Sequence, residues 1–163
     1  MATSTDRPFL YSEAERRRRD ASPWTLVQGV LAPLQFAVFL VSLALVSRTL
    51  ATGEGVALAN ASVVAKTLAL YAIMVTGSLW EKAVFGRYLF APAFYWEDVV
   101  SMLVLALHTA YLVALATGAL ATTGLMLLAL SAYATYLVNA CQFLLKLRAA
   151  RLQAPAYAMG AAR

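Results

Sequence analysis

Four long runs of apolar side chains constrain the fold of this chain more than any other feature of its sequence. The runs cover residues 24–50, 56–80, 99–120 and 125–145. Each is long enough to cross the hydrocarbon core of a bilayer, about 30 Å thick, as a helix. A helix also satisfies its own backbone hydrogen-bonding groups in lipid. The sequence therefore predicts an all-α integral membrane protein, built as a bundle of four transmembrane helices.

The composition argues against an ordinary soluble domain. Of the 163 residues, 62% are hydrophobic and 13% are charged, whereas soluble domains carry about a quarter charged residues. The net charge of +5 does not indicate nucleic-acid binding, because the basic residues gather at the ends of the apolar runs. The single cysteine, Cys141, provides neither an internal disulfide nor a paired-cysteine metal site.

The distribution of lysine and arginine predicts that both termini lie on the cytoplasmic side (N-in/C-in). Basic residues occur in the N-terminal arm, between the second and third runs, and in the C-terminal tail: Arg7, 16–19, Lys82, Arg87, Lys146, Arg148, Arg151 and Arg163. The two opposite loops contain only Arg48. Because cytoplasmic loops are enriched in basic residues, we assign the arm, the middle segment and the tail to the cytoplasm.

This topology divides the chain into three segments. Residues 1–23 form a basic cytoplasmic arm, 24–148 the membrane domain, and 149–163 a cytoplasmic tail that we expect to be disordered. Within the arm, Ser12 and Glu15 have the spacing of a capping box. We therefore expect a short helix that lies at the membrane interface, with its arginine run anchoring the topology on anionic lipid.

Polar side chains recur along each apolar run at sums of three and four residues, which places each set on one helix face. The sets are Gln28, Gln35 and Ser42; Thr67, Tyr71, Ser78 and Glu81; Glu97, Ser101, His108 and Tyr111; and Ser131, Thr135, Asn139, Gln142 and Lys146. Lipid disfavours such groups, so we expect the four faces to meet in a common interior. The simpler alternative is that they only hold the helices together by hydrogen bonds.

Ionisable residues within the runs are candidates for function. His108, the only histidine, lies about 16 Å along the helix from Glu97, near the membrane midplane, where we expect a neutral imidazole. Glu81, Glu97 and Asp98 cluster at the cytoplasmic ends of the second and third runs. They form either an interfacial salt-bridge set with nearby basic residues or paired carboxyl groups, one of which stays protonated as an acid. Lys66 falls near the opposite interface, where snorkelling explains it.

The segment between the second and third runs is rich in aromatic residues. Six of its residues from 85 to 96 are aromatic: Phe85, Tyr88, Phe90, Phe94, Tyr95 and Trp96. An aromatic belt at the membrane interface would explain them. The functional alternative is a stacking surface for a large flat ligand that enters from the cytoplasmic leaflet.

Long sequence blocks in the same regions resemble a known family. The blocks are WEKAVFGRYLFAP at 80–92, FYWEDVVSM at 94–102, WTLVQG at 24–29 and LAPLQF at 31–36. They closely resemble the 3-vinyl bacteriochlorophyllide hydratase family of phototrophic bacteria, and the resemblance extends over residues 11–151. It implies a lyase of bacteriochlorophyll biosynthesis in the bacterial inner membrane, cytoplasmic or intracytoplasmic. Such an enzyme adds water to the C3 vinyl group of a chlorophyllide-type macrocycle and leaves a 1-hydroxyethyl group.

The implied reaction needs few catalytic groups. Protonation of the terminal vinyl carbon creates a cation that the macrocycle delocalises, and water then adds to the inner carbon. The protein must supply an acid, a base for water and an anion near the cation. We expect Glu97 or Glu81 to be the acid and Asp98 the anion. His108 is either the base or the axial ligand of the pigment magnesium, and its distance from Glu97 favours the ligand.

The substrate is expected to contact the aromatic segment and several inward polar residues. These residues are Phe85, Tyr88, Phe90, Phe94, Tyr95, Trp96, Gln28, Gln35, Tyr71, Asn139 and Gln142. The expected partners are the pigment, water, the lipid membrane and other enzymes of pigment biosynthesis. We expect no nucleic acid, no protein-bound metal, and no cofactor beyond the magnesium that the substrate carries.

Two other kinds of protein fit part of the pattern. A non-catalytic pigment-binding or photosystem-assembly protein would use the aromatic segment and His108 but needs no acid. A small channel or transporter is disfavoured, because the sequence has no visible internal repeat and no pair of broken helices.

Overall fold

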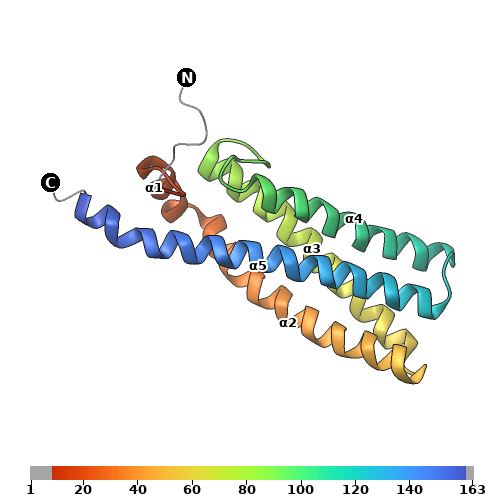
Figure 1. Ribbon diagram of the computed structural model, residues 1–163. Helices are drawn as coiled ribbons and strands as arrows, with labels where there is room; N and C mark the ends of the chain where they lie inside the picture. The colour runs from red at the N-terminus through yellow and green to blue at the C-terminus, as the bar shows by residue number, and fades with distance from the viewer. Residues whose placement is uncertain (1–8, 161–163) are drawn as a thin grey trace.

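The computed structural model describes residues 9–160 and folds them into five α-helices. The helices are α1 (Glu13–Ala21), α2 (Pro23–Thr52), α3 (Val56–Phe85), α4 (Tyr95–Thr117) and α5 (Thr122–Gly160). The long helices α2 and α3 form one antiparallel hairpin, α4 and α5 form a second, and the hairpins lie side by side (Figure 1). Packing is most extensive within each hairpin, and between the hairpins α2 meets α5 more extensively than α3 meets α4. The predicted bundle of four long helices is confirmed.

All four long helices are long and apolar enough to cross a membrane, but their ends differ from the predicted runs. Helix α4 begins at Tyr95 rather than residue 99, because its first turn accommodates Glu97 and Asp98 at the positive end of the helix dipole. It ends at Thr117, since Gly118 adopts a left-handed φ of 64°. Helix α5 continues to Gly160, past residue 148, in an alanine-rich stretch of high helix propensity.

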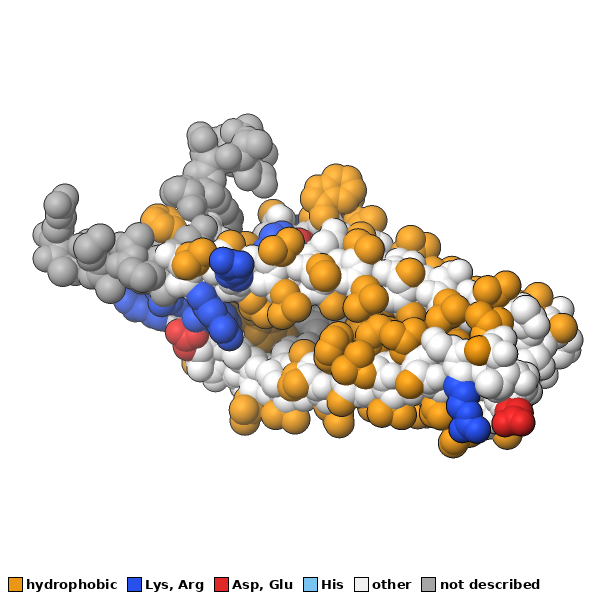
Figure 2. Space-filling view, turned by 60° about the horizontal axis from the view of Figure 1, so that its bottom comes forward, with side chains coloured by type: hydrophobic (Ala, Val, Ile, Leu, Met, Phe, Trp, Pro, Cys, Tyr) orange, Lys and Arg blue, Asp and Glu red, His pale blue; other side chains and the backbone are white. Residues whose placement is uncertain are grey.

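The distribution of side chains on the surface suits a bundle surrounded by lipid. Figure 2 shows a face covered with hydrophobic side chains, with Lys, Arg, Asp and Glu near its two ends. Large apolar side chains such as Leu26 (73% exposed) and Leu145 (66% exposed) point outward. Lipid provides no hydrophobic force between helices, so the bundle depends on close packing and interhelical hydrogen bonds.

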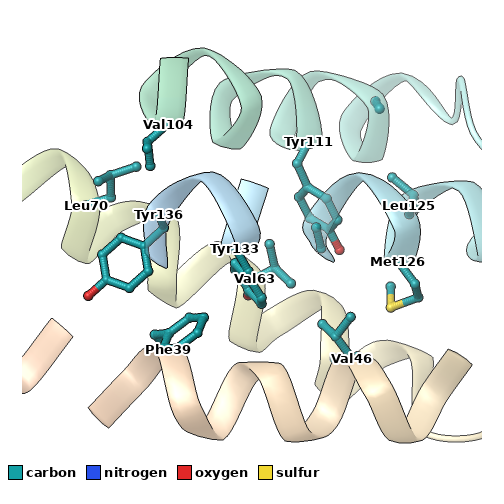
Figure 3. Close-up of a cluster of buried hydrophobic side chains, with 13 residues drawn as sticks. Phe39, Val46, Val63, Leu70, Val104, Tyr111, Leu125, Met126, Tyr133 and Tyr136 are labelled. Atoms are coloured by element: carbon teal, nitrogen blue, oxygen red, sulfur yellow. The ribbon is translucent and has the colours of Figure 1, made fainter. Parts of the chain in front are cut away.

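The apolar core lies between the two hairpins and draws on all four long helices (Figure 3). Its largest members are aromatic: Phe39 of α2, Tyr111 of α4, and Tyr133 and Tyr136 of α5. The ring of Phe39 meets Tyr133 edge-on and Tyr136 at a tilt, with ring centroids 5.4 and 5.0 Å apart. Three of these four rings carry a hydroxyl group, so the core is apolar only in part.

The short helix α1 confirms the predicted capping box. The Ser12 side chain accepts a hydrogen bond from the Glu15 backbone N–H, and the Glu15 carboxylate accepts one from the Ser12 N–H at 2.7 Å. Just before the helix, Tyr11 is buried against Phe85 and Phe94. Burial raises the pKa of the Tyr11 phenol to about 12. These contacts hold α1 beside the end of α3.

Candidate active site

The predicted inward face is confirmed on α4, and on α2 for Gln35 and Ser42 but not for Gln28, which is half-buried. The buried polar residues of these faces are Gln35 and Ser42, and Glu97, Ser101, His108 and Tyr111. On α3, Thr67 and Glu81 are buried, whereas Tyr71 and Ser78 are only half-buried. On α5 the prediction is wrong for Ser131, which is exposed and donates to the Leu127 carbonyl. Tyr133 and Tyr136 take the interior positions of that helix instead.

Buried ionisable groups occur at two depths of the bundle. Glu81, Glu97 and Asp98 are buried where α3 ends and α4 begins, and the half-buried Lys146 of α5 lies beside Glu97; we call these four residues the carboxyl centre. Lys66 and His108, with the neighbouring Gln35, Tyr133 and Tyr136, lie deeper, and we call them the deep polar centre. From Asp98 to His108 the rise along α4 is about 15 Å.

Glu81 and Asp98 form a pair in the carboxyl centre. Both are buried, at 4% and 5% exposure, and their carboxyl groups lie close enough to interact directly. A carboxylate can only accept hydrogen bonds, whereas a protonated carboxyl group can also donate one. Two carboxylates in contact repel each other, so this pair favours a proton on one partner, which leaves a neutral acid beside an anion.

Two consecutive backbone N–H groups hold this pair. Phe90 N–H donates to Asp98 Oδ2 at 2.7 Å, and Ala91 N–H donates to Glu81 Oε2 at 3.4 Å. Phe90 has a φ of 58°, the only positive φ among the non-glycine residues that the structure describes. Such a conformation costs on the order of 1–3 kcal/mol and tends to occur at functional sites. In this loop, the residue with the positive φ is the same Phe90 whose N–H donates to the carboxyl pair.

Glu97 has a different environment from the pair. Its carboxylate forms an ion pair with Lys146 Nζ at 2.7 Å, and Lys146 also donates to the Ala93 carbonyl. Asn139 donates to the Glu97 backbone carbonyl at 2.8 Å and accepts from Ser101 at 3.1 Å. The salt-bridge interpretation thus holds for Glu97 with Lys146.

Lys82 and Arg87 do not join this ion pair. Lys82 donates to the Gly86 carbonyl at 2.9 Å and Arg87 to the Phe90 carbonyl at 3.3 Å. Both side chains therefore brace the loop that follows α3.

The aromatic segment separates into a packed part and an exposed part. Phe85 and Phe94 pack against Trp80, with ring centroids 5.8 and 5.6 Å from it, and Phe94 also stacks on Phe143 of α5. The other four rings, of Tyr88, Phe90, Tyr95 and Trp96, are 36–68% exposed. Only these four are free to contact a ligand from outside without repacking of the loop.

His108 in the deep polar centre has a defined tautomer. Its Nδ1 lies 2.8 Å from the Val104 carbonyl, and a carbonyl only accepts, so Nδ1 carries the proton. The other nitrogen, Nε2, then has a free lone pair and no hydrogen-bond partner among the described residues. This arrangement resembles that of metal-binding histidines, whose second N–H usually donates to a carbonyl or carboxylate.

Lys66 contradicts the prediction that it snorkels to an interface. Its side chain is completely buried, and its Nζ lies 3.7 Å from the centre of the Tyr136 ring. The sequence placed Lys66 too close to the membrane surface, because α3 is 30 residues long and therefore longer than the hydrocarbon core requires. A lysine at this depth cannot reach water along its own helix.

The remaining substrate candidates are dispersed along the bundle. Gln28 donates to Thr76 at 2.7 Å, and Tyr71 shares a hydrogen bond with Thr109 at 2.8 Å. These two contacts join α2 to α3 and α3 to α4, as interhelical hydrogen bonds do. Within the described residues, Gln35 Oε1 and Gln142 Oε1 are buried without a partner.

Comparison with known proteins identifies the family of this chain. The model of the 2-vinyl bacteriochlorophyllide hydratase family matches residues 11–149. The chain belongs to this family. The names 2-vinyl and 3-vinyl denote one substituent under two numberings of the macrocycle, so the resemblance stated from the sequence is confirmed.

Two relatives carry the same name as the family. A 2-vinyl bacteriochlorophyllide hydratase of Rhodobacter capsulatus is 66% identical over 148 residues, which cover 91% of this chain and 86% of the relative. One of Cereibacter sphaeroides is 66% identical over 144 residues, 88% of this chain and 89% of the relative. No solved structure matches the chain. As a member of this hydratase family, the chain is a hydro-lyase.

Sequence reasoning missed three parts of the site. The backbone donors of Phe90 and Ala91 leave no mark in the residue types, and Tyr133 and Tyr136 looked like ordinary core residues. The burial of Lys66 could have been predicted from the sequence. Its neighbours Val63, Val64 and Leu68 are apolar, and a charged side chain within such a membrane helix is energetically unfavourable. An intramembrane charge of this kind should be treated as functional wherever its helix is longer than the bilayer requires.

Proposed function

We propose that the chain adds water to the C3 vinyl group of a chlorophyllide-type macrocycle in bacteriochlorophyll biosynthesis, and that the Glu81–Asp98 pair performs the proton transfer. Family membership supports the reaction, and two neighbouring buried carboxyl groups held by consecutive backbone N–H groups support the site. The reaction as proposed needs only a proton and water, so no cofactor takes part.

The first step is protonation of the substrate. The protonated carboxyl group of the pair gives its proton to the terminal vinyl carbon, and the electrons of the double bond form the new C–H bond. The inner carbon becomes a cation conjugated with the macrocycle. The pair then carries two negative charges, held by the N–H groups of Phe90 and Ala91, and this charge stabilises the cation.

The second step is addition of water. The oxygen of one water molecule bonds to the inner carbon, and the water proton passes to the carboxylate that gave up its proton. The pair returns to its starting state, and the product carries a 1-hydroxyethyl group. One carboxyl group thus serves first as acid and then as base, which removes the need for a base near His108.

Glu97 is less suited to the acid role than Glu81. Its carboxylate is already paired with Lys146 Nζ at 2.7 Å. Asp98 and Glu81 have no such cation within hydrogen-bonding distance in the described part of the chain. We therefore assign Glu97 and Lys146 to positioning, because they fix the start of α4 next to the pair.

His108 is proposed as the axial ligand of the magnesium that the pigment carries. The free lone pair of Nε2 and the Nδ1–H bond to Val104 supply the ligand and its orientation. The rise of about 15 Å between Asp98 and His108 is too long for one water molecule to join the two groups. A macrocycle held by His108 would instead extend its vinyl edge toward the carboxyl centre.

The proposed location is the inner membrane of a phototrophic bacterium, with both termini in the cytoplasm and α1 at the interface. The exposed rings of Tyr88, Phe90, Tyr95 and Trp96 would then meet the pigment at the cytoplasmic leaflet. The basic residues of α1, Arg16–Arg19, lie at the same end of the bundle as this loop, since α1 packs against the end of α3.

The deciding experiment is a turnover assay with purified protein and a vinyl chlorophyllide. The 1-hydroxyethyl product formed over many turnovers supports the enzyme. Binding of one pigment per protein without product would support the alternative, a pigment carrier. The Glu81→Gln variant links activity to the proposed site, because it keeps the side-chain shape and removes the proton.

A further inference from the structure

Lys66 is a buried cation that the proposed reaction does not use. It is fully buried in α3, and its Nζ has no hydrogen-bond partner among the described residues. Burial of an ammonium group without a partner is strongly unfavourable. The interaction with the Tyr136 ring at 3.7 Å offsets part of this cost, since aromatic faces attract cations.

The residues that the structure describes provide no negative charge next to the Lys66 ammonium. Glu81 is the acidic residue nearest to it along its own helix on the cytoplasmic side, about 22 Å away by helical rise. Glu97 and Asp98 lie at that same end of the bundle. At the opposite end, Glu54 is exposed and lies 3.7 Å from Arg48. The buried ammonium therefore calls for an anion from outside the described chain.

The neighbours of Lys66 also lack partners. Within the same described residues, Gln35 Oε1 and His108 Nε2 are buried and make no hydrogen bond. The rings of Phe39 and Tyr136 close this region between α2 and α5 (Figure 3). A ligand that reached Lys66 would have to displace the Tyr136 ring from the ammonium.

We propose that Lys66 binds the free carboxylate on the edge of the pigment opposite its vinyl group. This inference rests on the proposed function, because the suffix of chlorophyllide denotes a macrocycle whose acid side chain is not esterified. The carboxyl centre and the deep polar centre lie on the order of 15 Å apart along the helices, and the pigment would extend from one centre toward the other. With His108 at the metal and Lys66 at the carboxylate, the vinyl edge faces Glu81 and Asp98.

The site would distinguish the free acid from its ester. A carboxylate supplies the missing charge and accepts hydrogen bonds from Nζ, whereas an ester has no charge and is bulkier. A hydrogen bond to a charged group contributes enough to change affinity roughly tenfold or more. Lys66 would therefore select pigments before esterification.

The test compares a vinyl chlorophyllide with its methyl ester, by binding and by turnover. Wild-type protein should bind the free acid roughly tenfold or more tighter than the ester. Lys66→Met should bind both equally, through loss of affinity for the acid alone. Lys82→Met is the matched control, since it removes an exposed lysine of the same helix, and it should retain the preference.

The outcomes separate this inference from the proposed function. Equal affinity of the wild-type protein for acid and ester, with hydration of both, would overturn the carboxylate site and leave the hydratase assignment intact. This comparison needs no variant, so it holds even if Lys66→Met fails to fold. Without pigment, Lys66→Met should melt at a higher temperature than wild type, because an unpaired buried charge is removed. A lower melting temperature with an unchanged preference for the acid would make Lys66 purely structural.

Discussion

At the scale of single residues, the assignment of the acid is the most direct inference to test. Glu81→Gln and Asp98→Asn should each reduce kcat roughly 100-fold or more, the usual contribution of a general acid, because either change removes one carboxyl group of the pair and with it the transferable proton or the negative charge. Pigment binding should persist in both. Steady-state turnover with a vinyl chlorophyllide, together with a binding titration, measures the two effects. Turnover at the wild-type rate in both variants would exclude the pair.

Glu97→Gln serves as the comparison for this pair. It should lower the melting temperature, because Lys146 loses the partner that lies 2.7 Å from its Nζ, and removal of one member of a buried ion pair is destabilising. Its effect on kcat should be smaller than that of Glu81→Gln. If Glu97→Gln caused the larger loss of kcat, Glu97 would be the acid after all.

His108→Gln tests the proposed magnesium ligand. Glutamine keeps polarity but cannot replace the Nε2 lone pair that the tautomer leaves free. We expect weaker binding of the magnesium pigment and a shifted absorption spectrum of the bound pigment, while a magnesium-free pigment binds as it does to wild type. Full binding combined with lost turnover would instead identify His108 as a base. Retention of both would make it a structural residue.

The sequence predicted the identity of these residues better than their roles. Glu81, Asp98 and His108 were selected because ionisable groups are rare in apolar helices. Sequence alone could not separate Glu97 from Glu81. That distinction depends on the position of Lys146 on α5, and the packing of two hairpins determines it. Lys66 was misplaced for a similar reason, since its burial depends on the neighbours α5 provides.

At the scale of secondary structure, the loop from residue 86 to 94 links the fold to the proposed chemistry. Its backbone donors hold the carboxyl pair, and Phe90 has a left-handed φ of 58°. Phe90→Gly should retain kcat, because glycine adopts this φ without strain and keeps the N–H. Phe90→Pro should lose kcat to the extent that Asp98→Asn does, because proline has no N–H and a fixed φ of about −65°.

The two Phe90 variants share the loss of the aromatic ring, so a rise in KM common to both would report contact between this ring and the pigment. The difference in kcat between them reports the backbone donor. Equal kcat values in the two variants would show that the N–H of Phe90 does not contribute to catalysis. Circular dichroism of both proteins checks that the helices are retained.

The helices themselves were predictable from the sequence, and this loop was not. Each apolar run is continuous over more than 20 residues, which is a strong signal for a membrane helix, and the capping box of Ser12 and Glu15 is a local signal. The positive φ of a phenylalanine has no such signal, because bulky residues avoid that conformation. The loop retains it through contacts with two helices, so it becomes visible only once those helices are placed.

At the scale of the whole molecule, the two-hairpin arrangement brings both proposed anchors of the pigment to a single interior. The carboxyl centre joins α3, α4 and α5, and the deep polar centre joins all four long helices. Neither hairpin alone contains both the acid pair and the surroundings of Lys66. Separate expression of 1–86 and 87–163 should therefore give no turnover, and co-expression should restore it if the halves associate.

The orientation of the protein in the membrane determines which leaflet supplies the pigment. Cytoplasmic loops are enriched in Lys and Arg, and here the basic residues gather at the end of the bundle that carries α1, the loop after α3 and the end of α5. Reporter fusions after residue 20, near Gly86 and after Arg151 should all report the cytoplasm, and fusions near Gly53 and Thr122 the opposite side. Arg48 with Glu54 is the one ion pair described at that opposite end. A periplasmic signal at Gly86 would invert the topology and place the exposed aromatic rings and the carboxyl centre at the outer leaflet.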